Sequence, residues 1–287
     1  MFAPPGEDRC EICGGMTRPL PLRGGGSLRQ CASCGHLTRT LPDAPAGHRD
    51  HAYGGEPTLD AWRLAVTYRT LTAGGTPDSV FEIGFGAGSL LRRFLDTGAT
   101  IAGTDPDQLA VGIDPVVRSR GTLHTAPIED LREPAEQVEL VYGIHVLEHV
   151  LDPLRTLQRA AALLRPGGRV QFLTPAGDSA GLRLYGAAWW MLEDPTHVRF
   201  FTAESLRRAA ESVGLIDVRV TRPALDSLVT DVASLARLGR PRPRPHGVLA
   251  QRPVLLAGLA SAPVVLGARA IHPRLRPTLH LTARKAG

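Results

Sequence analysis

From residue 79 onward, short apolar runs alternate with longer segments whose apolar residues recur at helical spacing. The short runs predict strands, and the longer segments predict helices between them. We expect strands at 79–84, 100–105, 122–126, 138–144 and 169–175, and helices at 89–98 and 152–168. Strands and helices that alternate in this way usually form a parallel sheet with helices on both faces. The pattern therefore predicts an α/β fold for this part of the chain.

Three further elements extend the pattern. The stretch 58–71 predicts a helix with one apolar face, formed by Leu59, Trp62, Val66 and Leu71. A second helix has a clear beginning and end, because Thr202 is a favourable N-cap and Gly214 suits the position after the last turn. Two late strands are expected at 215–220 and 278–285. No internal repeat at the spacing of a solenoid is present in the sequence.

All four cysteines lie in residues 1–45, which are rich in glycine and proline and predict a loop-like module. They form two Cys-x-x-Cys pairs separated by 17 residues, a spacing typical of a zinc ribbon, with Cys10, Cys13, Cys31 and Cys34 as the ligands. A glycine follows each pair and allows the backbone to turn around a thiolate. Disulfides or iron are the alternatives, and His36 is not needed once four thiolates are in place. The chain begins without a basic region followed by an apolar run, so we expect a cytoplasmic protein with reduced cysteines.

The charge balance says little about a partner. The chain has 33 basic and 28 acidic residues, a formal net charge of +5, and Lys285 is its only lysine. An arginine excess can indicate contacts with nucleic acid, but these arginines are scattered, which favours a compositional bias of the genome. A phosphate-binding P-loop is excluded, because Ser89 and Leu90 follow the glycines where that motif needs its lysine.

The stretch VFEIGFGAGSL, residues 80–90, runs from a predicted strand through a glycine-rich turn into a helix. Such a turn points backbone N–H groups at a ligand. The spacing G-x-G-x-G differs from the dinucleotide fingerprint G-x-G-x-x-G. Glu82, two residues before the first glycine, disfavours a pyrophosphate and favours a cationic ligand. Asp105 ends the next predicted strand, where such folds hold a ribose.

Taken together, these features resemble motif I of the class I S-adenosylmethionine (SAM) methyltransferases, a Rossmann-like family with a seven-stranded sheet. The resemblance implies that the glycines pack the methionine part of SAM, that Asp105 binds the ribose and that Ile128 and Glu129 flank the adenine. The implied cofactor-binding residues are Glu82, Gly84, Phe85, Gly86, Gly88, Asp105, Pro106, Ile128, Glu129 and His145. The alternative is a purely structural turn.

A second block, YGIHVLEHVLDPLRTL with the later LRPGG, resembles SAM methyltransferases that act on small molecules, including ubiquinone-biosynthesis O-methyltransferases and antibiotic and sugar enzymes. The likeness covers roughly residues 78–222. His145, Glu148 and His149 would share one face of a helix, near the reactive methyl group. A histidine could act as general base, the group could bind a metal, or Glu148 and His149 could only secure the helix start. The ubiquinone enzymes carry an acid where His145 stands, which weakens the metal hypothesis.

Residues 176–199 follow the fifth predicted strand, where this fold usually covers its acceptor. Tyr185, Trp189, Trp190 and Met191 could line an apolar substrate site or simply pack beneath the lid, and His197 is a second candidate base. A cysteine module before a SAM domain also occurs in sugar C-methyltransferases, whose C-terminal third domain this chain is too short to hold.

The segment 224–277, rich in arginine, proline and leucine, is predicted to be a helical insertion. Its apolar run, bounded by Arg252 and Arg269, is shorter than the roughly 20 residues that cross a bilayer, and Pro263 interrupts it. We therefore expect no transmembrane segment. The helices could cover the active site, contact a membrane surface or bind a second subunit, and the oligomeric state stays open.

The sequence thus predicts a zinc-ribbon-like module at 1–45 and a SAM-dependent methyltransferase domain at 46–287. We expect methyl transfer to a small-molecule acceptor, a natural product or sugar, with O-methylation favoured over C-methylation. The candidate catalytic residues are His145, His149 and His197, the cofactors are SAM and structural zinc, and no nucleic-acid partner is expected. The alternative is a zinc-module RNA methyltransferase or a non-catalytic nucleic-acid-binding scaffold.

Overall fold

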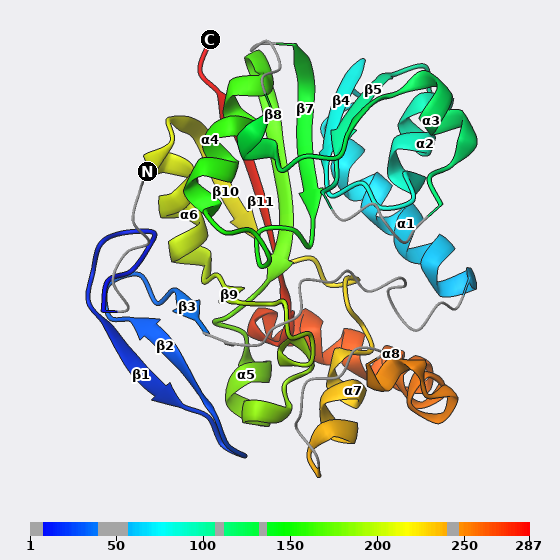
Figure 1. Ribbon diagram of the computed structural model, residues 1–287. Helices are drawn as coiled ribbons and strands as arrows, with labels where there is room; N and C mark the ends of the chain where they lie inside the picture. The colour runs from blue at the N-terminus through cyan, green and yellow to red at the C-terminus, as the bar shows by residue number, and fades with distance from the viewer. Residues whose placement is uncertain (1–7, 40–56, 107–111, 132–136, 240–246) are drawn as a thin grey trace. The chain divides into compact units, whose positions relative to one another are not determined.

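The computed structural model describes residues 8–39, 57–106, 112–131, 137–239 and 247–287. The chain forms two compact units, and each unit is built from three separate stretches of the sequence (Figure 1). The cysteine-bearing unit contains residues 1–56, 174–208 and 221–279, and the sheet unit contains residues 57–173, 209–220 and 280–287. The predicted boundary between residues 45 and 46 lies outside the described residues.

The sheet unit is built on a seven-stranded sheet in the order β10-β11-β8-β7-β4-β5-β6. Each predicted strand is present: β4 (Ser79–Ile83), β5 (Thr100–Thr104), β6 (Thr122–His124), β7 (Val138–Ile144), β8 (Leu164–Pro175), β10 (Leu215–Thr221) and β11 (Thr278–Lys285). The pairs β4–β5, β4–β7, β5–β6 and β7–β8 are parallel. The predicted Rossmann-like α/β fold is therefore confirmed.

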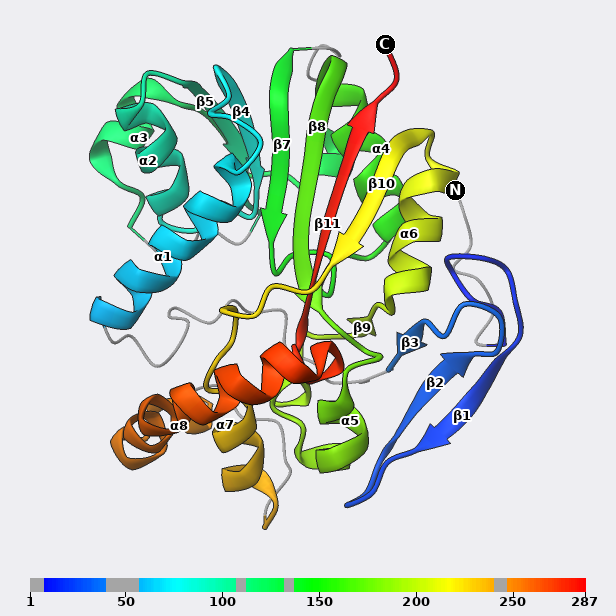
Figure 2. The same ribbon diagram turned by 180° about the vertical axis from the view of Figure 1, so that it is seen from behind.

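Helices cover both faces of this sheet. They are α1 (Pro57–Thr72), α2 (Ser89–Asp96), α3 (Pro115–Arg120) and α4 (Pro153–Leu163), with a short 3-10 turn, η2 (Ile128–Asp130). Figures 1 and 2 show α4 on the opposite face from α1. The predicted start of α4 is confirmed, since the Asp152 side chain accepts a hydrogen bond of 3.0 Å from Arg155 N and Pro153 stands in the first turn.

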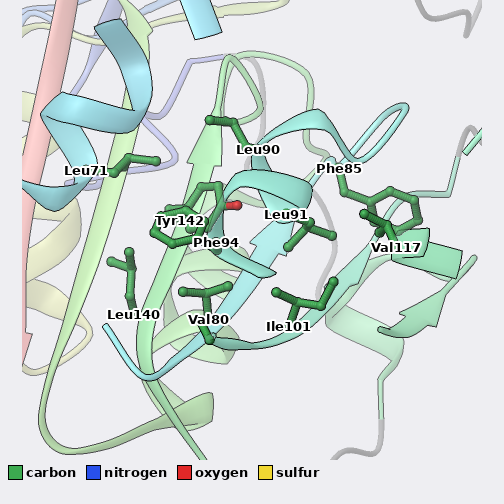
Figure 3. Packing of buried hydrophobic residues seen from close by; sticks show 11 residues of the cluster. Leu71, Val80, Phe85, Leu90, Leu91, Phe94, Ile101, Val117, Leu140 and Tyr142 are labelled. Atoms are coloured by element: carbon green, nitrogen blue, oxygen red, sulfur yellow. The ribbon is translucent and has the colours of Figure 1, made fainter. Parts of the chain in front are cut away.

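The core on the α1 and α2 face is aliphatic and aromatic. Figure 3 shows members of this core from α1, α2, α3, the turn after β4 and the central strands: Leu71, Val80, Phe85, Leu90, Leu91, Phe94, Ile101, Val117, Leu140 and Tyr142. The predicted apolar face of α1 is right at Leu71 and wrong at Trp62, which is exposed. Leu64 and Tyr68 pack against the core instead, because they lie on the same helical stripe as Leu71.

The cysteine-bearing unit contains a second sheet that the sequence pattern did not indicate. Its order is β1-β2-β3-β9, formed by β1 (Thr17–Pro21), β2 (Ser27–Cys31), β3 (Leu37–Thr38) and β9 (Arg199–Phe200). The strand β9 pairs antiparallel with β3, so a segment far along the chain completes the cysteine module's sheet. The predicted loop-like module is therefore a small β structure.

The segment between β8 and β9 packs into this unit's core. It contains α5 (Ala180–Tyr185) and the 3-10 turns η3 (Gly186–Ala188) and η4 (Trp190–Leu192). Trp189 is fully buried and Met191 nearly so, in a cluster with Leu28, Leu37 and Phe200, while Tyr185 and Trp190 pack at its edge. Within this unit these aromatic residues pack into a core beneath the segment. This agrees with the interpretation that they pack beneath the lid.

The predicted insertion, residues 224–277, contains two helices, α7 (Thr230–Arg237) and α8 (Arg252–Ile271). It also contains the 3-10 turns η5 (Val248–Ala250) and η6 (Pro273–Leu275). The expected interruption at Pro263 is wrong, since α8 is one continuous helix with Pro263 inside it. Leu259, four residues earlier, is exposed, so Pro263 lies on the solvent-facing part of the helix. Among the described residues, α8 alone is long and apolar enough, by length and composition, to cross a membrane.

Helix α6 (Ala203–Ser212) begins and ends as predicted. The Thr202 Oγ1 atom accepts a hydrogen bond of 3.0 Å from Ser205 N, and Ser205 Oγ accepts one of 2.9 Å from Thr202 N. Gly214, just past the helix, has φ +83°. The helix is therefore capped at both ends by the residues that the sequence marked.

Candidate functional site

The glycine turn lies at the carboxyl end of β4, between the strand and α2. Gly84 and Gly86 adopt φ of +75° and +52°, which side chains of L-residues rarely accept. A Cβ atom on Gly84 would lie 2.8 Å from Val146 Cγ2, whereas one on Gly86 would meet nothing within 4 Å. Glycine at position 84 thus permits close packing within the unit, and glycine at position 86 leaves open space beside the backbone.

Asp105 lies beside this turn, at the carboxyl end of the neighbouring strand β5. Its side chain is fully buried, and Oδ2 accepts a hydrogen bond of 2.7 Å from Gly86 N. The turn is also tied to β5 by a bond of 2.7 Å from Gly84 N to Thr104 O. Two sequence-predicted site residues, Gly86 and Asp105, are therefore brought together, with the exposed Pro106 next to them.

Glu82 sits beneath the turn and not at its surface. The carboxyl group is buried and accepts a hydrogen bond of 2.9 Å from Tyr142 Oη. Burial raises the pKa of Glu82 well above its ordinary value, the charge of Asp105 raises it further, and hydrogen bonds from Tyr142 and from the Leu91 backbone oppose the rise. Burial and the Glu82 charge raise the pKa of Tyr142 as well. Glu82 thus supports the glycine turn and the first turn of α2 from below. No feature of the sequence predicted its hydrogen bond with Tyr142.

The remaining predicted cofactor residues differ in exposure. The Phe85 side chain is buried in the core, so only its backbone faces the turn. Gly88 caps α2 with φ +79°. Ile128 is buried in η2, and the Glu129 carboxylate accepts a hydrogen bond from Thr156 Oγ1 of α4. Ile128 and Glu129 therefore belong to a short turn that packs against α4.

His145 follows β7 in a strained conformation. Its φ is +56°, in the left-handed region, and its backbone N donates a bond of 2.8 Å to Leu173 O of β8. The Nδ1 atom lies 3.0 Å from Oε1 of Glu148, a fully buried carboxyl group, while 22% of the His145 side chain is exposed. A carboxylate only accepts, so Nδ1 carries a proton in this contact.

The predicted helix for residues 145–149 is wrong, because the segment forms a turn and α4 begins only at Pro153. The turn still brings His145 to Glu148. His149 lies in the same turn and its backbone N donates 2.9 Å to Val146 O.

His197, the second candidate base, lies in the cysteine-bearing unit. Its Nδ1 is 2.8 Å from Met191 O, and its Nε2 is 4.0 Å from Asp194 Oδ2. A carbonyl oxygen only accepts, so this histidine also carries its proton on Nδ1. The ring packs edge-on against Phe200, with 6.5 Å between ring centroids.

The four cysteines converge as the sequence predicted. Their Sγ atoms all lie within 4.8 Å of one another, with 3.6 Å between Cys10 and Cys34 and 3.5 Å between Cys13 and each of Cys31 and Cys34. Tetrahedral zinc with bonds of about 2.3 Å places its sulfurs about 3.8 Å apart. The tight Cys-x-x-Cys loops are closed by bonds of 2.9 Å from Gly14 N to Cys10 O and 3.0 Å from Gly35 N to Cys31 O. The donor set and its spacing fit a zinc site with four cysteine ligands.

A buried ion pair beside this cluster was not expected from the sequence. Glu11 accepts from Arg199 of β9 through both carboxylate oxygens, at 2.7 and 2.9 Å, and lies 2.9 Å from His36 Nε2. Burial alone would raise the pKa of Glu11, but the hydrogen bond from His36 and the Arg199 charge lower it below its ordinary value. The Thr202 hydroxyl donates 2.7 Å to Cys34 O. His36 therefore secures the module through Glu11.

The fold, with a glycine turn and an acid at adjoining strand ends, defines a Rossmann-like nucleotide-binding class of α/β domain. Residues 60–220, more than half of the chain, match a family described as "Methyltransferase domain". The chain belongs to this family.

Curated relatives include ubiquinone biosynthesis O-methyltransferases. One from Rhodopseudomonas palustris is 30% identical over 147 residues, covering 48% of this chain and 58% of the relative. Another from Aeromonas salmonicida is 30% identical over 149 residues, covering 48% and 62%. The chain thus spans less than two thirds of the length of these relatives.

Solved structures support the fold. The Haemonchus contortus phosphoethanolamine N-methyltransferase 2, determined with S-adenosylhomocysteine, gives a TM-score of 0.53 at 16% identity, covering 79% of this chain and 53% of that one. A geranyl diphosphate methyltransferase determined with sinefungin gives 0.55 at 14% identity, covering 84% and 88%.

Proposed function

We propose that this protein is a SAM-dependent methyltransferase that acts on a small-molecule acceptor in the cytoplasm. The observation that carries the proposal is the open space at Gly86, whose N–H is held by Asp105 at the carboxyl ends of two parallel strands. Ligands of open α/β sheets bind at such strand ends. Family membership and the O-methyltransferase titles of the relatives support methylation, and O-methylation in particular.

In this proposal SAM lies along the glycine turn. Gly84, Gly86 and Gly88 would approach its methionine part, Asp105 with Pro106 would meet the ribose, and Ile128 with Glu129 would flank the adenine. Glu82 would act as a positioning residue, since its carboxyl group lies under the turn and is bonded to Tyr142. SAM would supply a methyl group already activated on a sulfonium, so the protein's part is alignment and removal of the acceptor proton.

His145 is the proposed general base. The buried Glu148 would orient the imidazole through Nδ1, and Nε2 would take the proton of an acceptor hydroxyl as the methyl group is transferred. The strained backbone at His145 supports this role, because such strain persists where surrounding structure fixes a functional side chain. His197 is the rival base, and His149 has a supporting role in the turn. The acceptor would be a natural product or a sugar.

The four thiolates are proposed to hold one structural zinc. All ligand positions would be filled by sulfur, which leaves no open position for water or substrate. The zinc would then fix the two Cys-x-x-Cys loops and the small sheet built on them.

The cofactor proposal is tested by calorimetric titration of SAM and S-adenosylhomocysteine. Gly86→Arg should abolish binding, because its side chain would fill the space beside the turn. Gly98→Arg is the matched control: Gly98 has φ +90°, has no atom within 4 Å of an added Cβ, and lies between α2 and β5, at the other end of the strands. We expect Gly98→Arg to strain the backbone to a similar degree but to bind SAM as wild type does. Unchanged SAM affinity in Gly86→Arg would refute the placement of the cofactor.

A further inference from the structure

Helix α8 presents an apolar surface to solvent. Between Pro253 and Ile271 every exposed residue is apolar, and the exposed fractions reach 64% at Leu256, 76% at Val264 and 74% at Ile271. Only Gly258 and Arg269 of this helix are buried. Monomeric soluble proteins rarely expose continuous apolar patches of this kind, which usually mark a binding surface.

Asp231 of α7 lies 3.7 Å from the buried Arg269 of α8, and the exposed charged residues at the two ends of α8 are basic. Asp231 is the last acidic residue of the sequence, while arginines continue to its end. Arg252 and Arg274 are exposed at the two ends of the helix. We propose that α8 binds the surface of an anionic phospholipid bilayer, with its exposed aliphatic side chains in the acyl boundary and the flanking arginines at the headgroups.

The buried side of α8 shows that the helix would lie on the membrane and not cross it. A Cβ on Gly258 would lie 2.8 Å from Val229 Cγ1, so the helix packs closely against the start of α7. Arg269 donates to Ala224 O, Asp226 O and Ser227 O at 3.0, 2.7 and 2.9 Å. Figures 1 and 2 show α7 and α8 side by side. A crossing helix would lose these bonds and place the Arg269 charge in lipid.

A second copy of the chain fits this surface less well. A two-fold contact between α8 helices would bring the exposed Arg252 and Arg274 of the two copies together, and these charges would have to be neutralised. Anionic headgroups supply that neutralisation.

The test is co-sedimentation of the full chain with phosphatidylcholine vesicles with and without phosphatidylglycerol. Wild-type protein should bind the anionic vesicles, should bind less at high salt, and should be released by a carbonate wash. The double variant Leu256→Gln with Val264→Gln should lower the partition coefficient at least about tenfold, since both side chains are already exposed and each would leave lipid. Arg252→Gln with Arg274→Gln should reduce the preference for anionic vesicles.

Leu184→Gln is the matched control, because Leu184 is an exposed leucine of α5 in the same unit and should bind as wild type does. Melting temperatures equal to wild type show that the variants are folded. Absence of vesicle binding, or equal binding by the double variant, would overturn the proposal, as would retention through the carbonate wash. Self-association that the double variant abolishes, with no vesicle binding, would assign the surface to a second copy instead. SAM affinity tests the proposed function separately.

Discussion

The ion pair between Glu11 and Arg199 should be a main stabilising contact of the cysteine-bearing unit. Replacing Glu11 by alanine removes both oxygens that Arg199 contacts and leaves the guanidinium buried, with only 11% of its side chain exposed. Removing one partner of a buried pair costs about 3–5 kcal/mol. We expect the lower end, because 16% of the Glu11 side chain still reaches solvent.

The assay is thermal unfolding of the zinc-loaded protein. A loss of about 3 kcal/mol lowers the melting temperature by roughly 6–12 °C, at about 2–4 °C per kcal/mol for a chain of this size. Glu11→Gln should fall between wild type and Glu11→Ala, since the amide still accepts a hydrogen bond from Arg199 but carries no charge. The alanine variant should also release zinc to a chelator faster, because Glu11 lies between two of the ligands.

The matched control is Glu204→Ala. Glu204 contacts arginine side chains through both carboxylate oxygens, as Glu11 does, at 2.6 and 2.7 Å, but 41% of its side chain is exposed. Solvent screens such a pair, so the melting temperature should change by no more than about 2 °C. Equal melting temperatures for the two alanine variants would refute the argument that burial makes the Glu11 pair strong.

Three further predictions concern zinc, pH and the base. Metal analysis should find one zinc per chain, and Cys31→Ser with Cys34→Ser should lose it; zinc retained by that variant would contradict the site. The raised pKa of Glu82 means that the folded chain keeps a proton that the unfolded chain has released, so stability should fall as pH rises from the ordinary value of 4.5 through the raised one. Melting temperature measured against pH should lose this slope in Glu82→Gln, and an unchanged slope would exclude Glu82 as its source. Once an acceptor is found by S-adenosylhomocysteine release, His145→Ala should lower kcat about 10²–10⁴-fold with SAM affinity nearly intact, and His197→Ala should have little effect. A large loss of kcat in His197→Ala with little loss in His145→Ala would assign the base to His197. Turnover near the wild-type rate in a variant that lacks both histidine side chains would exclude either histidine as a base.

The sheet could be predicted from sequence because its central strands are mostly buried. Glu139 is the one charged residue in the run Val138–Ile144. The small sheet of the cysteine-bearing unit lacked that signal. The strand β1 is largely exposed, and in β2 only Leu28 and Cys31 are buried, so neither strand has the continuous apolar run of a buried strand.

Contacts between side chains that are far apart in the sequence could not be predicted from local sequence patterns. Glu11 and Arg199 are 188 residues apart, and Tyr142 and Glu82 are 60 apart, so neither pair has a spacing that a motif could encode. The turn at residues 145–149 shows a different limit. The spacing of His145 and Glu148 suggested a helix, but the contact between them is made by a turn that closes the distance equally well.

The proposed cofactor site and the remaining features of this chain lie in different parts of the sequence. The proposed cofactor contacts lie wholly in the sheet unit, within the residues 60–220 that match the methyltransferase family. The cysteine module and helix α8 lie outside that match. Two features of the structure are built largely outside those residues: a small sheet that carries the four cysteines, and an exposed apolar helix with basic ends. An acceptor that is itself apolar or held at a membrane would give the second of these a direct role, because the helix would bring the enzyme to the surface where its substrate is concentrated.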